Sequence, residues 1–365
     1  MDDRACMAHA LALAARGLGR VAPNPAVGCV IVRDGHAIGR GRTGDGGRPH
    51  AETVALAEAG AAARGATAYV TLEPCSHHGK TPPCAEALIA AGIARVVVAA
   101  GDPDPRVDGR GFRLLRDAGI RVETGLMADA AERLNRGFVL NRTARRPLVT
   151  LKLATSLDGR IATASGHSQW ITGEAARRHG HLLRARHDAI LVGAGTVAAD
   201  DPELTCRIAG LEGHSPVRVV LDSHLRIPLT GRLVRTAAQV PLWVFCHRNA
   251  DVARMAALES AGTRLFRTAF DRSGLQDVHE VLRQLADGGI TRLLVEGGAQ
   301  VAASFLRAGV VDRIAWYRAG LLIGGDGLAA LSGIGIGQLD GAPRFTRTGQ
   351  RVLGDDMLET FEAGA

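Results

Sequence analysis

Residues 49–52 read Pro-His-Ala-Glu, and residues 71–84 read Thr-Leu-Glu-Pro-Cys-Ser-His-His-Gly-Lys-Thr-Pro-Pro-Cys. His50–Ala59 has the pattern of a helix, Ala68–Leu72 that of a buried strand, and a second helix is expected to begin at Cys84. A helix, a strand and another helix in so short a stretch are typical of a layered α/β domain. The same stretch holds the His, Glu and Cys side chains of a candidate metal site, so it determines the chemistry as well as the fold class.

Helices and strands alternate on both sides of this stretch. An N-terminal helix is expected over Asp2–Ala15, and a β-hairpin over Ala26–Gly41. Two strands and two helices follow, the strands at Arg95–Ala100 and Ile120–Glu123 and the helices at Gly111–Ala118 and Asp129–Asn141. The first part of the chain is therefore predicted to be a three-layer α/β/α domain.

A polar, Arg-rich segment that ends in proline, Arg142–Pro147, marks the expected domain boundary. It predicts one domain at 1–146 and another at 147–365. The second part alternates again, with strands near Leu148–Ala154, Ala189–Val192, Val217–Leu221, Leu242–Phe245, Leu293–Val295 and Arg313–Tyr317 and helices near Gly173–Arg186 and Leu275–Ala286. This pattern predicts a second α/β domain.

The composition of the 365-residue chain is that of a globular protein of about two domains. Apolar residues make up 46% and charged residues 22%, which excludes wholesale disorder. The aromatic content of 4% weakens the case for binding single-stranded nucleic acid, where stacking dominates. No apolar run approaches the ~18–20 residues of a membrane span, and the start lacks the features of a signal peptide, so we expect a cytoplasmic protein.

The net charge of +7 comes almost entirely from arginine, because Lys80 and Lys152 are the only lysines. An Arg- and Ala-rich chain most simply reflects a coding bias, so the charge is weak evidence for a nucleic-acid partner. It is equally compatible with a small anionic substrate such as a phosphate ester.

His50, Cys75 and Cys84 offer one imidazole and two thiolates, a set suited to tetrahedral zinc with its fourth position open to water. Zinc lowers the pKa of that water, and Glu52 can take its proton and pass it to a leaving amine. Because Cys84 opens a predicted helix, the helix N-terminus favours its thiolate form. The order H-x-E, P-C and a further Cys is the signature of zinc nucleobase deaminases, although here eight residues separate the cysteines. A structural zinc site, or two unrelated buried cysteines, is the alternative.

Three segments, Pro23–Gly28, Pro49–Glu52 and Thr71–Cys84, together resemble the deaminase half of the bifunctional riboflavin-biosynthesis deaminase/reductase family. The resemblance implies a cytidine-deaminase-like domain that uses zinc to remove the 2-amino group from 2,5-diamino-6-ribosylamino-4(3H)-pyrimidinone 5′-phosphate. It also implies that the substrate is bound by Asn24, His77 and Lys80.

Lys80 lies inside the predicted metal loop, where a phosphate contact suits it better than the alternative of a solvated surface lysine. Relatives in the family usually carry a histidine seven positions before the zinc histidine, and this chain has Thr43 there. We expect phosphate contacts to be redistributed over the loop Arg42–Arg48 and the zinc chemistry to be unaffected.

A glycine motif follows the strand predicted at Ala189–Val192, because Gly193–Ala198 reads G-x-G-x-x-A. Together with Asp222 at the end of a later strand, it would suit a Rossmann domain that binds NAD. Pro202 argues against this interpretation, since a Rossmann helix should continue there, and the two aspartates before it would repel a pyrophosphate.

A second glycine pair, Gly297-Gly298, follows the strand predicted at Leu293–Val295, and a helix is expected to begin near Ala299. Such a turn lets backbone N–H groups approach a phosphate at a helix N-terminus. The alternative is a tight turn without a ligand, in which Glu296 only caps the helix.

Four segments, Lys152–Ala162, Ser168–Thr172, Asp188–Val197 and Glu296–Gly298, resemble the reductase half of the same family. The resemblance implies a dihydrofolate-reductase-like α/β domain that uses NADPH to reduce the ribosyl group to ribityl. By motif position it implies cofactor contacts at Ala154, Trp170, Thr196, Asp200, Ser223, Gly297 and Gly298, and substrate contacts at Ser168, Arg184, Leu204, Arg207 and Glu296.

The residue types at this second site suit such a reaction. Arg184 and Arg207 can hold a phosphate by paired hydrogen bonds. Trp170 either flanks the nicotinamide or fills core. Hydride delivery that leaves the sugar ring open needs a nearby cation or acid, and we expect Lys152 to supply it together with Glu296.

The expected partner is a small phosphorylated pyrimidine, with one zinc ion per chain and NADPH as cofactors and with neither nucleic acid nor membrane. A homo-oligomer is left open. An RNA-editing deaminase with an accessory domain is one rival, opposed by the low aromatic content and by the nucleotide-binding second half. An inactive zinc module that serves as a scaffold is the other, opposed by the presence of Glu52.

Overall fold

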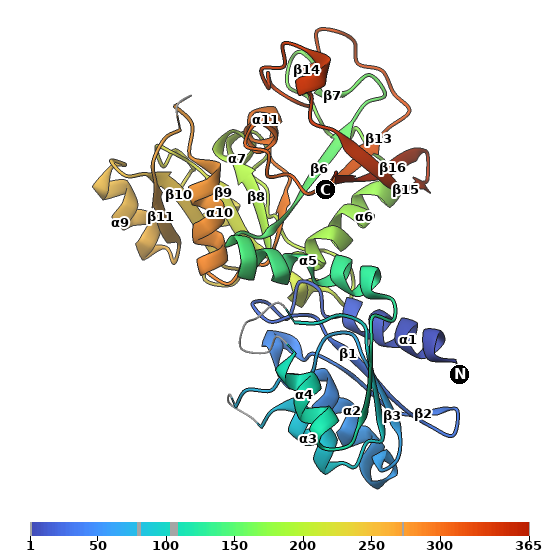
Figure 1. The fold of residues 1–365 in the computed structure, drawn as a ribbon. Coiled ribbons are helices and arrows are strands. Elements are labelled where there is room, and N and C mark those ends of the chain that lie inside the picture. The colour runs from blue at the N-terminus through green and yellow to red at the C-terminus, as the bar shows by residue number, and fades with distance from the viewer. Residues whose placement is uncertain (1, 79–81, 103–108, 272–273, 365) are drawn as a thin grey trace. The chain divides into compact units, whose positions relative to one another are not determined.

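The computed structural model describes residues 2–78, 82–102, 109–271 and 274–364. It divides the chain into two compact units, Met1–Arg145 and Arg146–Ala365. Each unit has a β-sheet with helices packed against it (Figure 1), which confirms the predicted α/β class. Within the described ranges, no helix has both the length and the apolar composition needed to span a lipid bilayer.

A five-stranded sheet in the order β2-β1-β3-β4-β5 forms the middle of the first unit. The predicted hairpin consists of β1 (Gly28–Arg33) and β2 (His36–Arg42), and β1 also pairs antiparallel with β3 (Thr67–Val70). β4 (Arg95–Val98) and β5 (Arg121–Thr124) continue the sheet in parallel. Parallel neighbours need crossover connections, and helices provide them here.

The helices of the first unit cover both faces of its sheet, which gives the three predicted layers. They are α1 (Asp3–Ala15), α2 (Ala51–Ala59), α3 (Cys84–Ala90), α4 (Arg110–Asp117) and α5 (Ala128–Ala144). Side chains of α2, α3 and α4 pack with Cys29 and Ile31 in one core, whereas α1 and α5 pack with Val30 and Val32 in another. Successive strand residues point to opposite faces, so β1 contributes to both cores.

α2 lies against the hairpin at a distance that only glycine permits. A Cβ atom added to Gly41 would lie 2.0 Å from the carbonyl oxygen of Ala51. No side chain tolerates so short a contact, so Gly41 lets the first turn of α2 rest directly on β2. This contact fixes His50 and Glu52, which lie at the start of α2, relative to the sheet.

α5 extends further than the sequence predicts. The sequence predicts a helix over Asp129–Asn141 that leads into the boundary segment Arg142–Pro147, but the helix continues through Ala144. Arginine is a good helix former, so the Arg-rich composition does not interrupt the helix. It ends where Arg145 adopts a left-handed conformation, shortly before a proline that cannot continue it. Arg142 is therefore a helical residue.

A nine-stranded sheet in the order β11-β10-β9-β8-β12-β6-β13-β16-β15 organises the second unit. All the predicted strands are present, as β6 (Leu148–Thr155), β8 (Ala189–Gly193), β9 (Val217–Leu221), β10 (Leu242–His247), β12 (Arg292–Val295) and β13 (Arg313–Arg318). The sequence does not predict β7 (Arg160–Ala162), β11 (Arg264–Thr268), β14 (Leu328–Ala329), β15 (Phe345–Leu353) or β16 (Asp356–Ala363). β15 is an edge strand with mostly exposed residues, so it lacks the apolar pattern of the buried strands.

The helices of the second unit also lie on both faces of its sheet. They are α6 (Glu174–Ala185), α7 (Ala194–Asp200), α8 (Arg232–Arg235), α9 (Val252–Ser260), α10 (Val278–Asp287) and α11 (Ala299–Arg307). α10 and α11 belong to one hydrophobic core, and α7, α8 and α9 belong to another.

Four features of the second unit argue against the Rossmann interpretation. Its strand order differs from the Rossmann order, and its sheet ends in an antiparallel hairpin. α7 ends at Asp200, two residues before Pro202. The buried Asp222 carboxylate accepts a hydrogen bond from the Ile227 N–H at 2.8 Å, so it stabilises the fold and is not presented to a ribose.

Candidate functional site

One ring nitrogen and two sulfur atoms come together in the first unit. His50 precedes α2, Cys84 begins α3, and Cys75 lies in the loop between β3 and α3. His50 Nδ1 is 3.2 Å from Cys84 Sγ and 3.6 Å from Cys75 Sγ, and the three ligand atoms all lie within 4.8 Å of one another. The Cys84 N–H donates to Cys75 Sγ, and the Ala85 N–H donates to the Cys75 carbonyl, which holds the loop in place. The three predicted ligands thus form one cluster.

The two cysteines of this cluster differ in their affinity for protons. Hydrogen bonds from Cys84 and His50 lower the pKa of Cys75 to about 4. The hydrogen bond to Cys75 and burial raise the pKa of Cys84. Two thiolates in contact are unstable without a cation. A zinc ion fits this donor set, because it would neutralise both sulfur atoms and bind the imidazole.

Glu52 lies in the first turn of α2 and is 4% exposed. Its carboxyl group lines the same pocket as His50 and Cys75. Burial and the charge of Cys75 raise the pKa of Glu52 to about 7. A buried carboxyl group that can both take up and release a proton is suited to general acid–base catalysis.

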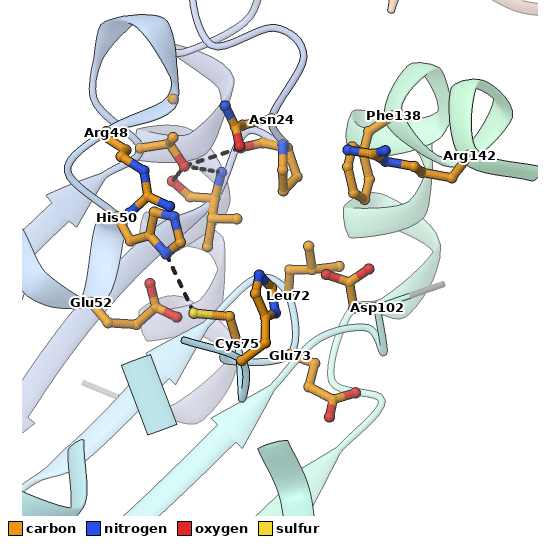
Figure 2. Close-up of a pocket in the computed structure, with 15 residues that line it drawn as sticks. Asn24, Arg48, His50, Glu52, Leu72, Glu73, Cys75, Asp102, Phe138 and Arg142 are labelled. Atoms are coloured by element: carbon orange, nitrogen blue, oxygen red, sulfur yellow. Dashed lines mark hydrogen bonds between the residues drawn. The ribbon is translucent and has the colours of Figure 1, made fainter. Parts of the chain in front are cut away.

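A pocket with about 660 Å³ of empty space, open to solvent, is lined by His50 and Cys75 of this cluster (Figure 2). Asn24 and His77 of the predicted substrate site both line it. The Nδ1 atom of His77 is buried and has no hydrogen-bond partner among the described residues, which suits a group that a ligand completes. Lys80, also predicted to bind substrate, lies outside the described residues.

Thr43, which replaces the usual histidine, is part of the pocket wall. Its hydroxyl donates to the Pro25 carbonyl at 3.1 Å and accepts from the Val27 N–H at 2.9 Å. The residue is 3% exposed, so it holds the loop that follows Asn24 and has little surface to offer a ligand. The loop Arg42–Arg48, over which the sequence predicts that phosphate contacts are redistributed, contributes Arg48 to the pocket wall.

Phe138, Arg142 and Asp102 also line the pocket, although the sequence analysis did not single them out. Phe138 and Arg142 belong to α5 and lie across the pocket from His50 and Glu52 in Figure 2. A spacing of four residues places both on one helix face. This spacing is the feature of the sequence from which their shared position could have been predicted. The sequence does not say which part of the fold that face meets.

Three charged side chains meet in the second unit. Arg184 donates from Nε and Nη2 to the two oxygens of Glu296, each at 2.9 Å, and from Nη1 to the Thr205 carbonyl. Lys152 Nζ is 3.7 Å from Glu296 Oε2 and 5.8 Å from the centre of the Tyr317 ring. Burial opposes the charge of Glu296, but Arg184 and Lys152 lower its pKa to about 2. The paired donors of Arg184 thus face Glu296, whereas the sequence suggests that they hold a phosphate.

The turn at Gly297 and Gly298 joins β12 to α11 and touches the turn at the start of α7. A Cβ atom at Gly297 would lie 3.2 Å from both Gly193 N and Val192 Cα, so the two turns meet through backbone atoms. The Gly298 N–H donates to Thr196 Oγ1 at 3.3 Å. Three of the predicted NADPH contacts are therefore neighbours.

Other predicted residues of the second site have different surroundings. Trp170 is 65% exposed and lies against the Arg177 guanidinium, so it does not fill core. Leu204 is 3% exposed and lies inside a hydrophobic cluster, so its contact with the substrate stays a prediction. Arg207 is exposed and pairs with Glu203 at 3.1 Å.

Four further predicted contacts are spread over several elements. Ala154 is half-buried on β6, and Asp200 is the last residue of α7. Ser223 follows β9, and its carbonyl accepts from the His247 N–H at 3.0 Å. Ser168 is half-buried in the loop before α6. Their contacts with a ligand stay predictions.

Comparisons with known proteins cover both units. A family model for the RibD C-terminal domain matches residues 147–358, and one for the cytidine and deoxycytidylate deaminase zinc-binding region matches residues 1–100. The riboflavin biosynthesis protein RibD of Bacillus amyloliquefaciens is 45% identical over 355 residues, which are 97% of this chain and 94% of that protein.

Two solved structures are similar over nearly the whole chain. Form 1 of Acinetobacter baumannii RibD has a TM-score of 0.89 and 38% identity, covering 100% of this chain and 99% of the other. A diaminohydroxyphosphoribosylaminopyrimidine deaminase/5-amino-6-(5-phosphoribosylamino)uracil reductase from Thermotoga maritima has a TM-score of 0.87 and 36% identity, covering 99% and 98%.

Proposed function

The chain belongs to the RibD family of bifunctional deaminase/reductase enzymes of riboflavin biosynthesis, and from this premise we propose how its two reactions are divided. Residues 1–146 form the zinc-dependent deaminase domain, and residues 147–365 form the NADPH-dependent reductase domain. The first removes the 2-amino group of 2,5-diamino-6-ribosylamino-4(3H)-pyrimidinone 5′-phosphate. The second reduces the ribosyl group of the product to ribityl, giving 5-amino-6-ribitylaminouracil 5′-phosphate.

The observation that carries this proposal is the cluster of His50, Cys75 and Cys84, together with a pocket that His50, Cys75 and Glu52 all line. The three ligands would hold a zinc ion, which when bound makes a water molecule more acidic. Glu52 accepts the protons of the attacking water and delivers one to the pyrimidine ring nitrogen and one to the departing amino group, so that ammonia leaves as a carbonyl forms. His77 donates or accepts at the pyrimidine through its otherwise unsatisfied Nδ1 atom.

In the reductase domain, we assign the cofactor to the turn at Gly297 and Gly298 with Thr196, and NADPH supplies the hydride when bound. Lys152 stabilises the charge that develops on the sugar oxygen as the ring opens. Glu296 holds Lys152 in place, and Arg184 in turn orients Glu296 by its two hydrogen bonds.

The other assigned contacts complete this second site. Ala154, Trp170, Asp200 and Ser223 contact the cofactor in the proposal, and Ser168, Leu204 and Arg207 contact the substrate. Of the two arginines assigned to substrate, Arg207 is the exposed one, so it is the one we assign to the phosphate.

We place the enzyme in the cytoplasm, with a small-molecule substrate and without nucleic acid or membrane as partners. Its six free cysteines support a reducing compartment. The exposed edge strand β15 supports assembly into a homo-oligomer, because its unpaired backbone groups offer a surface to a second copy. The RNA-editing and scaffold alternatives leave the reductase half unexplained.

Replacing Glu52 tests the deaminase assignment. Glu52→Gln removes the proton shuttle and leaves the three ligands intact, so ammonia release from the diaminopyrimidine phosphate should fall by at least about 100-fold. Bound zinc and NADPH oxidation on supplied deaminated substrate should stay at wild-type levels. Ammonia and NADPH are followed in parallel in the same reactions.

Glu58→Gln is the matched control. Glu58 lies on the same helix but pairs with Arg40 at the surface, so its replacement should preserve ammonia release. If Glu52→Gln releases ammonia at the wild-type rate while retaining zinc, Glu52 is not the proton shuttle.

A further inference from the structure

The pocket of the deaminase domain has two chemically different ends. At one end are His50 and Cys75 of the metal cluster together with Glu52. Across the pocket, α5 contributes the ring of Phe138 and the guanidinium of Arg142 (Figure 2). The proposed deamination chemistry uses the groups at the first end. Phe138 and Arg142, at the α5 end, have no role in it.

A buried hydrogen-bonded pair fixes the position of α5 against the pocket. Asn135 is 4% exposed, and its Oδ1 accepts from the Ala26 N–H at 2.9 Å while its Nδ2 donates to the Ala26 carbonyl at 3.1 Å. Asn135, Phe138 and Arg142 follow one another at spacings of three and four, so they share one helix face. The two hydrogen bonds between Asn135 and Ala26 therefore determine where Arg142 lies relative to Asn24, which is two residues before Ala26 in the same loop.

The positive charge of Arg142 is oriented but not neutralised. Its Cζ atom lies 5.5 Å from the centre of the Phe138 ring, a contact that holds a guanidinium by its attraction to the ring face. Within the described part of the chain, no carboxylate forms an ion pair with Arg142.

Glu73, an acidic residue that lines the pocket, is held by backbone groups elsewhere. Glu73 accepts from the Gly109 and Gly111 N–H groups, each at 3.0 Å, and thereby caps α4. Asp102 has an interaction of its own. Arg142 is therefore a cation in the pocket wall with donors to offer a ligand.

We propose that Arg142 binds the 5′-phosphate of the deaminase substrate and that Phe138 holds the guanidinium in position. The inference rests on the proposed function and adds a specificity-determining residue to it. A guanidinium presents paired N–H donors that match two phosphate oxygens. The phosphate is attracted to the α5 end, so the substrate enters with its pyrimidine ring toward the metal cluster.

The test compares two substrates, the phosphorylated diaminopyrimidine and the same compound without its phosphate. Arg142→Gln should raise KM for ammonia release from the phosphorylated compound by about 10- to 100-fold, the value of a hydrogen-bonded charge pair. It should leave kcat/KM for the dephosphorylated compound unchanged. Inorganic phosphate should inhibit the wild-type deaminase competitively and inhibit the variant more weakly.

Arg136→Gln is the matched control, because it removes an arginine from the same helix at a position that does not line the pocket. Its KM should match that of the wild type. Zinc content and reductase turnover report whether each variant is folded. Arg142→Lys keeps the charge without the paired donors and should give a smaller increase in KM, which separates binding from a folding defect.

An equal change with both substrates, or no change with either, would overturn the phosphate assignment. If wild-type enzyme released no ammonia from the phosphorylated compound, the proposed deaminase function itself would fail, and this inference with it.

Discussion

Glu296 is a carboxylate buried in the reductase domain between Arg184 and Lys152. Burial favours the neutral acid, but the two cations lower its pKa from 4.5 to about 2. The unfolded chain therefore binds this proton more tightly than the folded one. The stabilisation from Glu296 is fully present above about pH 4.5 and is lost as the pH falls toward 2.

At this residue scale, Glu296→Gln should lower the free energy of unfolding at pH 7 by about 3 kcal/mol, because it leaves two partly buried cations without their partner. The difference from wild type should narrow as the pH is lowered from 5 toward 3. Urea unfolding of the whole enzyme at several pH values measures both effects.

Glu174→Gln serves as the control, since Glu174 is an exposed carboxylate in the same unit. Its unfolding curve should match that of the wild type at each pH. A loss of stability in Glu296→Gln that is constant with pH would mean that the ion pairs do not set the pKa of Glu296.

At the scale of secondary-structure elements, the proposed reductase site contains two strand-to-helix turns that touch each other. The β8–α7 turn contains Gly193, and the β12–α11 turn contains Gly297. Side chains would keep these turns apart, since a Cβ atom on Gly193 would lie 2.9 Å from Val301 Cγ2. The glycines therefore bring Thr196 and Gly298 within hydrogen-bond distance.

Gly297→Ala should destabilise the reductase domain by about 1–3 kcal/mol, because the added Cβ atom meets the backbone of the neighbouring turn. Gly298→Ala is the matched control: its Cβ atom would lie 3.6 Å from Thr196 Oγ1, an ordinary contact, so its thermal unfolding should stay close to that of the wild type. Equal losses in the two variants would show that the close approach of the turns is unimportant.

At the scale of the whole molecule, two compact units carry two different chemistries. The cluster of His50, Cys75 and Cys84 lies in the first unit, whereas the Lys152–Glu296–Arg184 cluster lies in the second. The proposed division assigns the metal requirement to the first reaction alone.

Removing zinc with a chelator should therefore abolish ammonia release and leave NADPH oxidation on supplied deaminated intermediate unchanged. Added zinc should restore the first reaction. Both rates are measured on one chelated sample before and after the addition. A parallel loss of NADPH oxidation would indicate that the reductase domain depends on the metal.

The sequence by itself determined the local features of this protein. Short continuous apolar segments predict the buried strands, because a strand that is buried on both faces needs apolar side chains at successive positions. His50, Cys75 and Cys84 were identifiable because few side chains bind zinc and their order along the chain is distinctive. The exposed strand β15 gave no such signal, since solvent constrains its residues little.

The tertiary structure alone decided which distant surfaces meet. Asn135 binds Ala26 across 109 positions of sequence, and that contact brings Arg142 into the deaminase pocket. Arg184 pairs with Glu296 across 112 positions, which turns an expected phosphate ligand toward a carboxylate. The physical reason is that the spacing of residues along a helix or strand determines which of them share a face, whereas the packing of the whole chain determines what that face contacts.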